Sequence, residues 1–76
     1  MTKKQIEKLA DYIAFGAADA DVQKNPAEKK EHLKEVESFF RILAFIHEDF
    51  TKVEENRKAA MKRAEQLYSD YLNELC

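Results

Sequence analysis

Glycine and proline are almost absent from this sequence, and their scarcity limits the fold more than any other feature. Gly16 and Pro26 are the only glycine and the only proline in 76 residues. An all-β sandwich or barrel needs tight turns between many short strands, and these two residue types supply most of them. The sequence therefore excludes an all-β fold and predicts an all-α protein. Hydrophobic residues make up 45% of the chain, enough for the core of one domain spanning residues 1–76.

Two helix starts carry clear capping signals. Thr2 and Gln5 have the spacing of a capping box, in which each side chain accepts a hydrogen bond from a backbone N–H at the helix start. Asn25 is followed by Pro26, a residue favoured at the first helical position, and Glu28 stands where a second box is completed. These signals predict a first helix over residues 3–22 and a chain break at 23–25.

The second boundary is marked less clearly, because no glycine or proline follows Pro26. Thr51 and Glu54 have the spacing of another capping box, which gives helices over 26–49 and 52–75 and a small three-helix bundle. The alternative is one continuous helix over 26–75, because its apolar residues recur three and four apart without a change of phase. Such a helix would be about 75 Å long and would have to dimerise to bury its apolar stripe. We favour the three-helix bundle.

The second helix carries more apolar surface than two neighbouring helices can cover. Its apolar residues span an arc of about 200°, roughly twice that of an ordinary surface helix. Residues 39–46, FFRILAFI, contain only one polar residue, Arg41. We therefore expect part of this arc, notably Phe39, Ile42 and Ile46, to contact a second protein chain, with a homodimer as the first candidate.

Two further phenylalanines lie away from the predicted core. On helical wheels, Phe45 and Phe15 each fall among charged residues, where a large aromatic ring adds nothing to the core. Aromatic side chains surrounded by polar groups are typical of the residues that contribute most to protein interfaces. We predict that both contact a partner. Gly16, by contrast, is expected to make room for the phenylalanines of the second helix.

No set of residues in the sequence indicates catalysis or metal binding. His32 and His47 are fifteen residues apart on one predicted helix, about 22 Å along its axis, and cannot share a metal ion. Glu28 and His32 supply at most two ligands. The chain has no glycine-rich phosphate loop and no recognisable catalytic triad. We expect no enzyme activity, no metal and no cofactor.

Arg57, Lys58, Lys62 and Arg63 form the main basic cluster and are candidate phosphate contacts. The net charge of −2 argues against a nucleic-acid-binding domain, and no short recognition helix after a glycine turn is evident. Arg57 lies within an apolar stripe, so we expect it either to extend outward to solvent or to pair with an acidic residue such as Asp49 or Glu54, across the turn or across a dimer interface.

Taken together, these features predict a small, non-enzymatic helical protein that acts by binding another protein and also associates with itself. Chains of this kind often regulate or inhibit a larger target, as many phage and mobile-element inhibitors do. A nucleic-acid-binding regulator that uses residues 57–63 and a structural subunit of an assembly are the alternatives. The only cysteine, Cys76, permits no internal disulfide, and no apolar run reaches the ~20 residues of a membrane span, so we expect a cytoplasmic protein.

Overall fold

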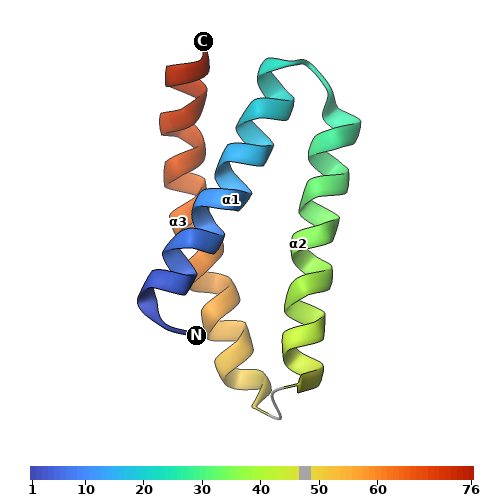
Figure 1. The fold of residues 1–76 in the computed structure, drawn as a ribbon, viewed down its shortest axis with the longest axis vertical. Coiled ribbons are helices and arrows are strands. Elements are labelled where there is room, and N and C mark those ends of the chain that lie inside the picture. Colours follow the sequence, from blue (N-terminus) through green and yellow to red (C-terminus); the bar gives the residue numbers. More distant parts are fainter. Residues whose placement is uncertain (47–48) are drawn as a thin grey trace.

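The computed structural model describes residues 1–46 and 49–76, and this part of the chain forms three α-helices and no strand. They are α1 (Lys3–Val22), α2 (Pro26–Ile46) and α3 (Phe50–Leu75). Figure 1 shows that α1 and α3 run in the same direction while α2 runs in the opposite one. The predicted three-helix bundle is confirmed.

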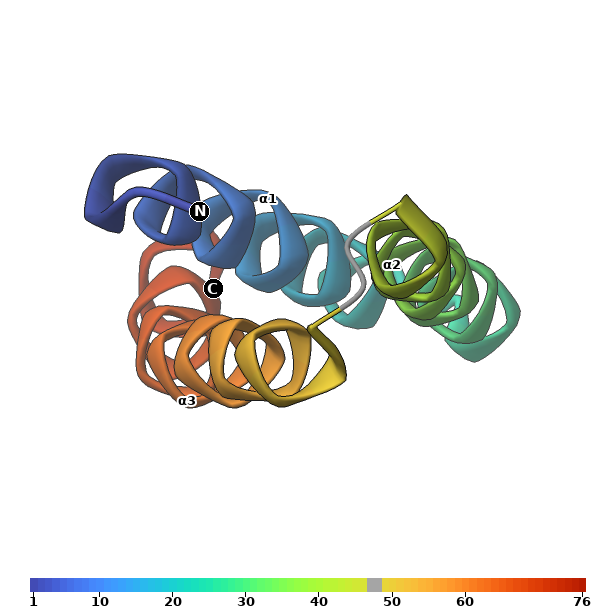
Figure 2. The same cartoon turned by 90° about the horizontal axis from the view of Figure 1, so that it is seen from below.

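The three helices are not equally well packed. Contact between α1 and α3 is the most extensive, and contact between α2 and α3 is the least. Seen from below, α2 lies to one side of the α1 and α3 pair (Figure 2), and the molecule is flat, with extents of 41 × 23 × 13 Å. Only two residues of α2, Val36 and Phe40, are buried. The second helix is thus the least covered element of the fold.

The turn between α1 and α2 is a Schellman motif followed directly by a helix cap. Lys24 has a φ of 57°, and its N–H donates to the carbonyl of Asp21 at 3.0 Å. The Asn25 N–H donates to the carbonyl of Ala20 at 2.9 Å, so the last carbonyls of α1 are satisfied. Asn25 then caps α2 by accepting from the Glu28 N–H at 3.3 Å. The predicted break at 23–25 is confirmed, as is the capping box of Thr2 and Gln5.

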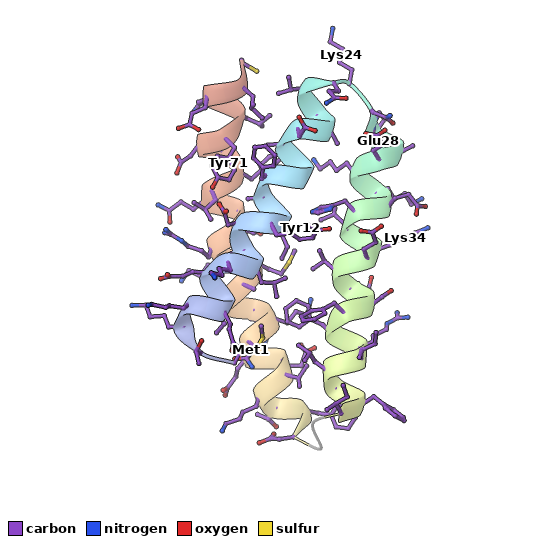
Figure 3. All side chains as sticks on the ribbon, viewed as in Figure 1. Met1, Tyr12, Lys24, Glu28, Lys34 and Tyr71 are labelled. Atoms are coloured by element: carbon purple, nitrogen blue, oxygen red, sulfur yellow. The ribbon has the colours of Figure 1, made fainter. Side chains whose placement is uncertain are left out.

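Lys24 occupies a left-handed backbone position that glycine adopts without steric penalty. We expect Lys24→Gly to raise the free energy of unfolding by about 0.5 to 1 kcal/mol, because the side chain points into solvent (Figure 3) and only the strain is removed. Gln23, which precedes it, has a φ of −78° and a ψ of −1°, so Gln23→Gly is the matched control and should not stabilise. Urea unfolding of both variants tests this prediction, and an equal effect of the two glycines would contradict it.

The start of α3 differs from the sequence prediction. Asp49, not Thr51, is the N-cap: it has non-helical dihedrals, and its side chain accepts from the Lys52 N–H at 3.2 Å. Thr51 already lies in the first turn of α3. The predicted bounds 26–49 and 52–75 are therefore wrong at this junction, and so is the continuous helix, because the chain reverses direction here. His47, considered above together with His32 as a metal ligand, lies outside the described residues.

Two substitutions distinguish these caps. Asp49→Ala should lower the free energy of unfolding by about 1 kcal/mol, because the Lys52 N–H loses its acceptor. Thr51→Ala should be neutral or slightly stabilising, because alanine is the better residue inside a helix. Thermal unfolding followed by circular dichroism measures both changes. A larger loss for Thr51→Ala would return the cap to the position that the sequence predicted.

Candidate protein-binding surface

A histidine, not a phenylalanine, fills the space that Gly16 leaves on α1. A Cβ atom on Gly16 would lie 2.5 Å from both Cε1 and Nε2 of His32, so the imidazole rests directly on the glycine. The same ring lies 4.7 Å from the Tyr12 ring, centroid to centroid, and its Nε2 is 3.2 Å from the Tyr12 carbonyl oxygen. The expectation that Gly16 makes room for phenylalanines is therefore wrong, since the contact joins α1 to the first half of α2.

A polar cluster joins all three helices near the first turn of α2. Lys29 Nζ lies 3.0 Å from the Asp21 carboxylate on α1 and 3.1 Å from the Tyr68 hydroxyl on α3. The Tyr68 hydroxyl also donates to Asp21, and the Lys29 ammonium sits 4.7 Å from the centre of the Tyr68 ring. Together with the contact at His32, this cluster anchors the beginning of α2. At the other end of α2, the described residues form no polar cluster that joins this helix to α1 and α3.

The last two turns of α2 expose large apolar side chains. We call this surface the apolar end of α2, and it continues onto the first residue of α3. The exposed fractions are Phe39 41%, Ile42 58%, Phe45 91%, Ile46 66% and Phe50 67%. Monomeric proteins rarely leave several neighbouring aromatic and aliphatic side chains open to water, and such surfaces mark binding sites.

The exposed residues occupy two sides of α2. Phe39, Ile42 and Ile46 follow one another at spacings of three and four, so they share one side of the helix. Phe45 lies about 100° from Ile46, next to Arg41. The prediction that Phe45 lies outside the core is confirmed by its exposure. Its role in binding stays a prediction.

Phe15 lies in a different place from the apolar end of α2. It is half exposed, and its ring packs edge-to-face against Tyr71 near the end of α3, with the centroids 5.8 Å apart. The Tyr71 hydroxyl also donates to Asp11 on α1. The structure thus does not bring Phe15 and Phe45 together. Sequence reasoning missed Tyr12, which is half exposed beside His32 although it falls on a mainly polar face.

The basic residues of α3 do not form one surface. Arg57 makes two hydrogen bonds of 3.1 Å to the carboxylate of Glu54 one turn earlier. The hydrogen bond from Arg57 lowers the pKa of Glu54, and the carboxylate in turn raises the pKa of Arg57. Lys58 and Lys62 are exposed on one side of α3. Arg63 lies on another side and lines a hollow shared with basic and acidic residues of α1: Lys4, Glu7, Lys8 and Asp11. The expected pairing of Arg57 with Glu54 is confirmed, and the predicted phosphate-binding cluster is dispersed.

An open apolar hollow of about 140 Å³ lies between the three helices. It is lined mainly by small and aliphatic side chains, with Lys29 and Glu65 at its edge. Across residues 1–46 and 49–76, no three histidine, cysteine or acidic side chains are grouped closely enough to hold a metal ion. The apolar end of α2 is therefore the candidate binding surface, because a partner there would remove the most apolar side-chain surface from water.

Known proteins assign no role to this surface. Comparison of the chain with protein-family models, with curated proteins and with solved structures finds no match. No helix in the described part of the chain has the length and apolar character to cross a bilayer. Function must therefore be inferred from the chemistry of the exposed side chains.

Proposed function

We propose that the chain is a non-enzymatic protein-binding module and that the apolar end of α2 docks onto another protein. The observation that carries the proposal is the contrast within α2, which buries only Val36 and Phe40 while Phe45 is 91% exposed. Covering exposed aromatic and aliphatic side chains is the main favourable term in protein association. A nucleic-acid partner has less support, because the basic residues of 57–63 that would contact phosphates lie on different sides of α3.

Such a module acts by covering part of a larger protein, and we infer a regulatory or inhibitory role of that kind. It presents its binding residues on a helix with a short connection to α3, and it has a small mass of 8.9 kDa. These properties suit a chain that occludes a site on its target. Cys76 is exposed as a free thiol, which fits a reducing compartment such as the cytoplasm.

Affinity capture from the native host lysate tests this function. The wild-type chain is compared with the double variant Phe45→Ala, Ile46→Ala and with the control Leu75→Ala, which truncates an exposed apolar residue at the far end of α3. Circular dichroism first establishes that all three chains are folded. We expect a protein that the wild type and the control retain and the double variant loses, because interface anchors contribute about 2 kcal/mol or more each. Equal retention by all three chains would refute the proposal.

A further inference from the structure

One exposed side of α2 is acidic in its first half and apolar in its second. We call it the acidic-apolar side. Its residues follow one another at spacings of three and four and are all exposed: Glu28, Glu31, Glu35, Phe39, Ile42 and Ile46. None of the three glutamates belongs to an ion pair within the described part of the chain, whose pairs involve Asp21, Glu37 and Glu54. This side therefore presents free negative charge followed by free apolar surface.

A second exposed side of α2 carries the opposite charge in its first half. We call it the basic side, and its residues are also spaced three and four apart and exposed: Lys30, Lys34, Ser38, Arg41 and Phe45. Lys34 points away from the other two helices (Figure 3). In its second half this side ends on Phe45, the most exposed large apolar residue described. The two sides are thus opposite in charge in the first half of α2, and each ends on a large exposed apolar residue, Ile46 or Phe45.

We propose that copies of this chain bind one another through α2, with the acidic-apolar side of one copy against the basic side of the next. The α2 helices run parallel and at the same height, and the contacts close into a ring. The proposal rests on the proposed function, in that it takes the outer surface of α2 to be a protein-binding surface. In the absence of another protein, the occupant of that surface is a second copy of this chain.

The register of the two sides matches residue by residue. From Glu31 onward, each residue of the acidic-apolar side directly follows one of the basic side in the sequence. In parallel helices at equal height, such residues differ by about 1.5 Å along the axis. Glu31 of one copy then lies beside Lys30 of the next, and Ile46 lies beside Phe45. In the first half of α2, Glu31 and Glu35 meet Lys30 and Lys34. In the second half Ile46 meets Phe45, Phe39 lies beside Ser38, and Ile42 lies along the aliphatic stem of Arg41, whose guanidinium is paired with Glu37.

A two-fold dimer in which the same side of α2 meets itself is poorly matched. If the two helices are parallel, Glu31 and Glu35 face their own counterparts, and like charges in contact are destabilising. If they are antiparallel over their full length, the glutamates face Ile42 and Ile46, and carboxylates would be covered by apolar side chains without a partner. Contact between unlike sides pairs the opposite charges of the first half and brings Ile46 against Phe45 at the end of the helix.

The angle between the two sides sets the size of the ring. Consecutive residues of an α-helix differ by about 100° around the axis, so the two sides are about 100° apart. An angle of about 100° lies between the corner angles of a square and of a regular pentagon. A repeated contact between unlike surfaces at this angle closes into a ring of four or five copies. We therefore expect four or five copies. The buried Val36 and Phe40 lie on the opposite side of α2, so α1 and α3 point outward from the ring.

Sedimentation equilibrium and native mass spectrometry of the purified full chain in reducing buffer test the proposal. The expected mass is about 36 to 45 kDa, four or five times the 8.9 kDa of one chain. Two charge reversals, Glu31→Lys with Glu35→Lys and Lys30→Glu with Lys34→Glu, should each weaken association at least about 100-fold when made alone. The chain that carries all four substitutions should associate again, because its two sides are complementary once more.

The restored association of that four-fold variant is the decisive result, since only contact between unlike sides allows it. If the four-fold variant stays monomeric while circular dichroism shows it folded, the proposal is overturned. A wild type that sediments as a monomer or as a two-fold dimer also overturns it. Phe45→Ala should also weaken association, whereas Phe15→Ala, which truncates a half-exposed ring on α1, should leave it unchanged. The ring and the proposed function can fail separately. If the wild type is monomeric but captures a protein that the Phe45→Ala, Ile46→Ala variant loses, the ring is refuted and the proposed function is retained. If the wild type forms the ring but captures no such protein, the proposed function is refuted and the ring is retained.

Discussion

Phe40→Ala is expected to lower the free energy of unfolding by about 3 to 5 kcal/mol, which is the usual range for removing a core phenylalanine. Phe40 is 4% exposed and is one of only two buried residues on α2. Its ring belongs to the buried cluster that includes Ile13 on α1 and Val53 on α3. Without it, α2 keeps the contact at His32 and the polar cluster around Lys29, but its second half loses its main attachment. The total free energy of unfolding of a domain of this size is small, so a loss of this magnitude is a large part of it.

Phe39 and Phe45 provide matched controls on the same helix. Phe39 directly precedes Phe40 and touches it edge-to-face, with the ring centroids 5.8 Å apart, yet it is 41% exposed. Phe45 is 91% exposed, so Phe45→Ala should change stability by less than about 1 kcal/mol. Urea unfolding at a concentration where the chain is monomeric compares the three variants. Equal losses for Phe40→Ala and Phe45→Ala would mean that α2 is covered on every side within one chain.

The features that the sequence predicts well are those that depend on neighbouring residues. Thr2 and Asn25 each accept from the backbone N–H three residues on, where the spacing predicts it. The second capping box is not completed, because the Asn25 N–H donates to the Ala20 carbonyl and not to the Glu28 side chain. The outward position of Phe45 follows in the same way from the helical period alone. Caps and faces of this kind need no knowledge of the tertiary fold.

The junction of α2 and α3 shows the limit of such local reasoning. Asp49 and Thr51 both have side chains that can accept from a backbone N–H three residues on, that of Lys52 or of Glu54. The sequence alone does not distinguish the two caps. Which residue becomes the cap depends on how α3 packs in the bundle, and the structure places the cap at Asp49, two residues earlier than predicted. Helix ends are defined least sharply where no glycine or proline marks them.

The contacts that position α2 could not be derived from sequence spacing. Asp21 and Tyr68 are 47 residues apart, and Tyr12 and His32 are 20 residues apart, so each pair exists only because the bundle brings it together. Gly16 did indicate a close approach, but not which side chain approaches it. The apolar end of α2 was predicted as a surface, whereas Tyr12 was missed because its neighbours on the wheel are polar.

Ala60→Leu is expected to be strongly destabilising, because α1 and α3 are held together through small residues. Ala60 and Ala64, one turn apart on α3, are 0% and 3% exposed, and Ala10 on α1 is also fully buried. All three belong to the same buried cluster, and Ala60 does not line the apolar hollow between the helices, so a larger side chain at Ala60 has no free space to enter. Added core volume costs about 1 to 3 kcal/mol, sometimes more. The most extensive helix contact of the fold is the one affected.

Ala59 gives an adjacent control, because it is exposed while Ala60 is buried. Ala59→Leu adds the same atoms at the next position of the same helix, and its effect should stay within about 0.5 kcal/mol. A loss of 2 to 3 kcal/mol in a chain of this size lowers the melting temperature by about 10 °C or more, which circular dichroism measures directly. If Ala60→Leu kept the wild-type melting temperature, the contact between α1 and α3 would have room for a larger side chain at this position, and close packing of small residues would not be what holds the two helices together.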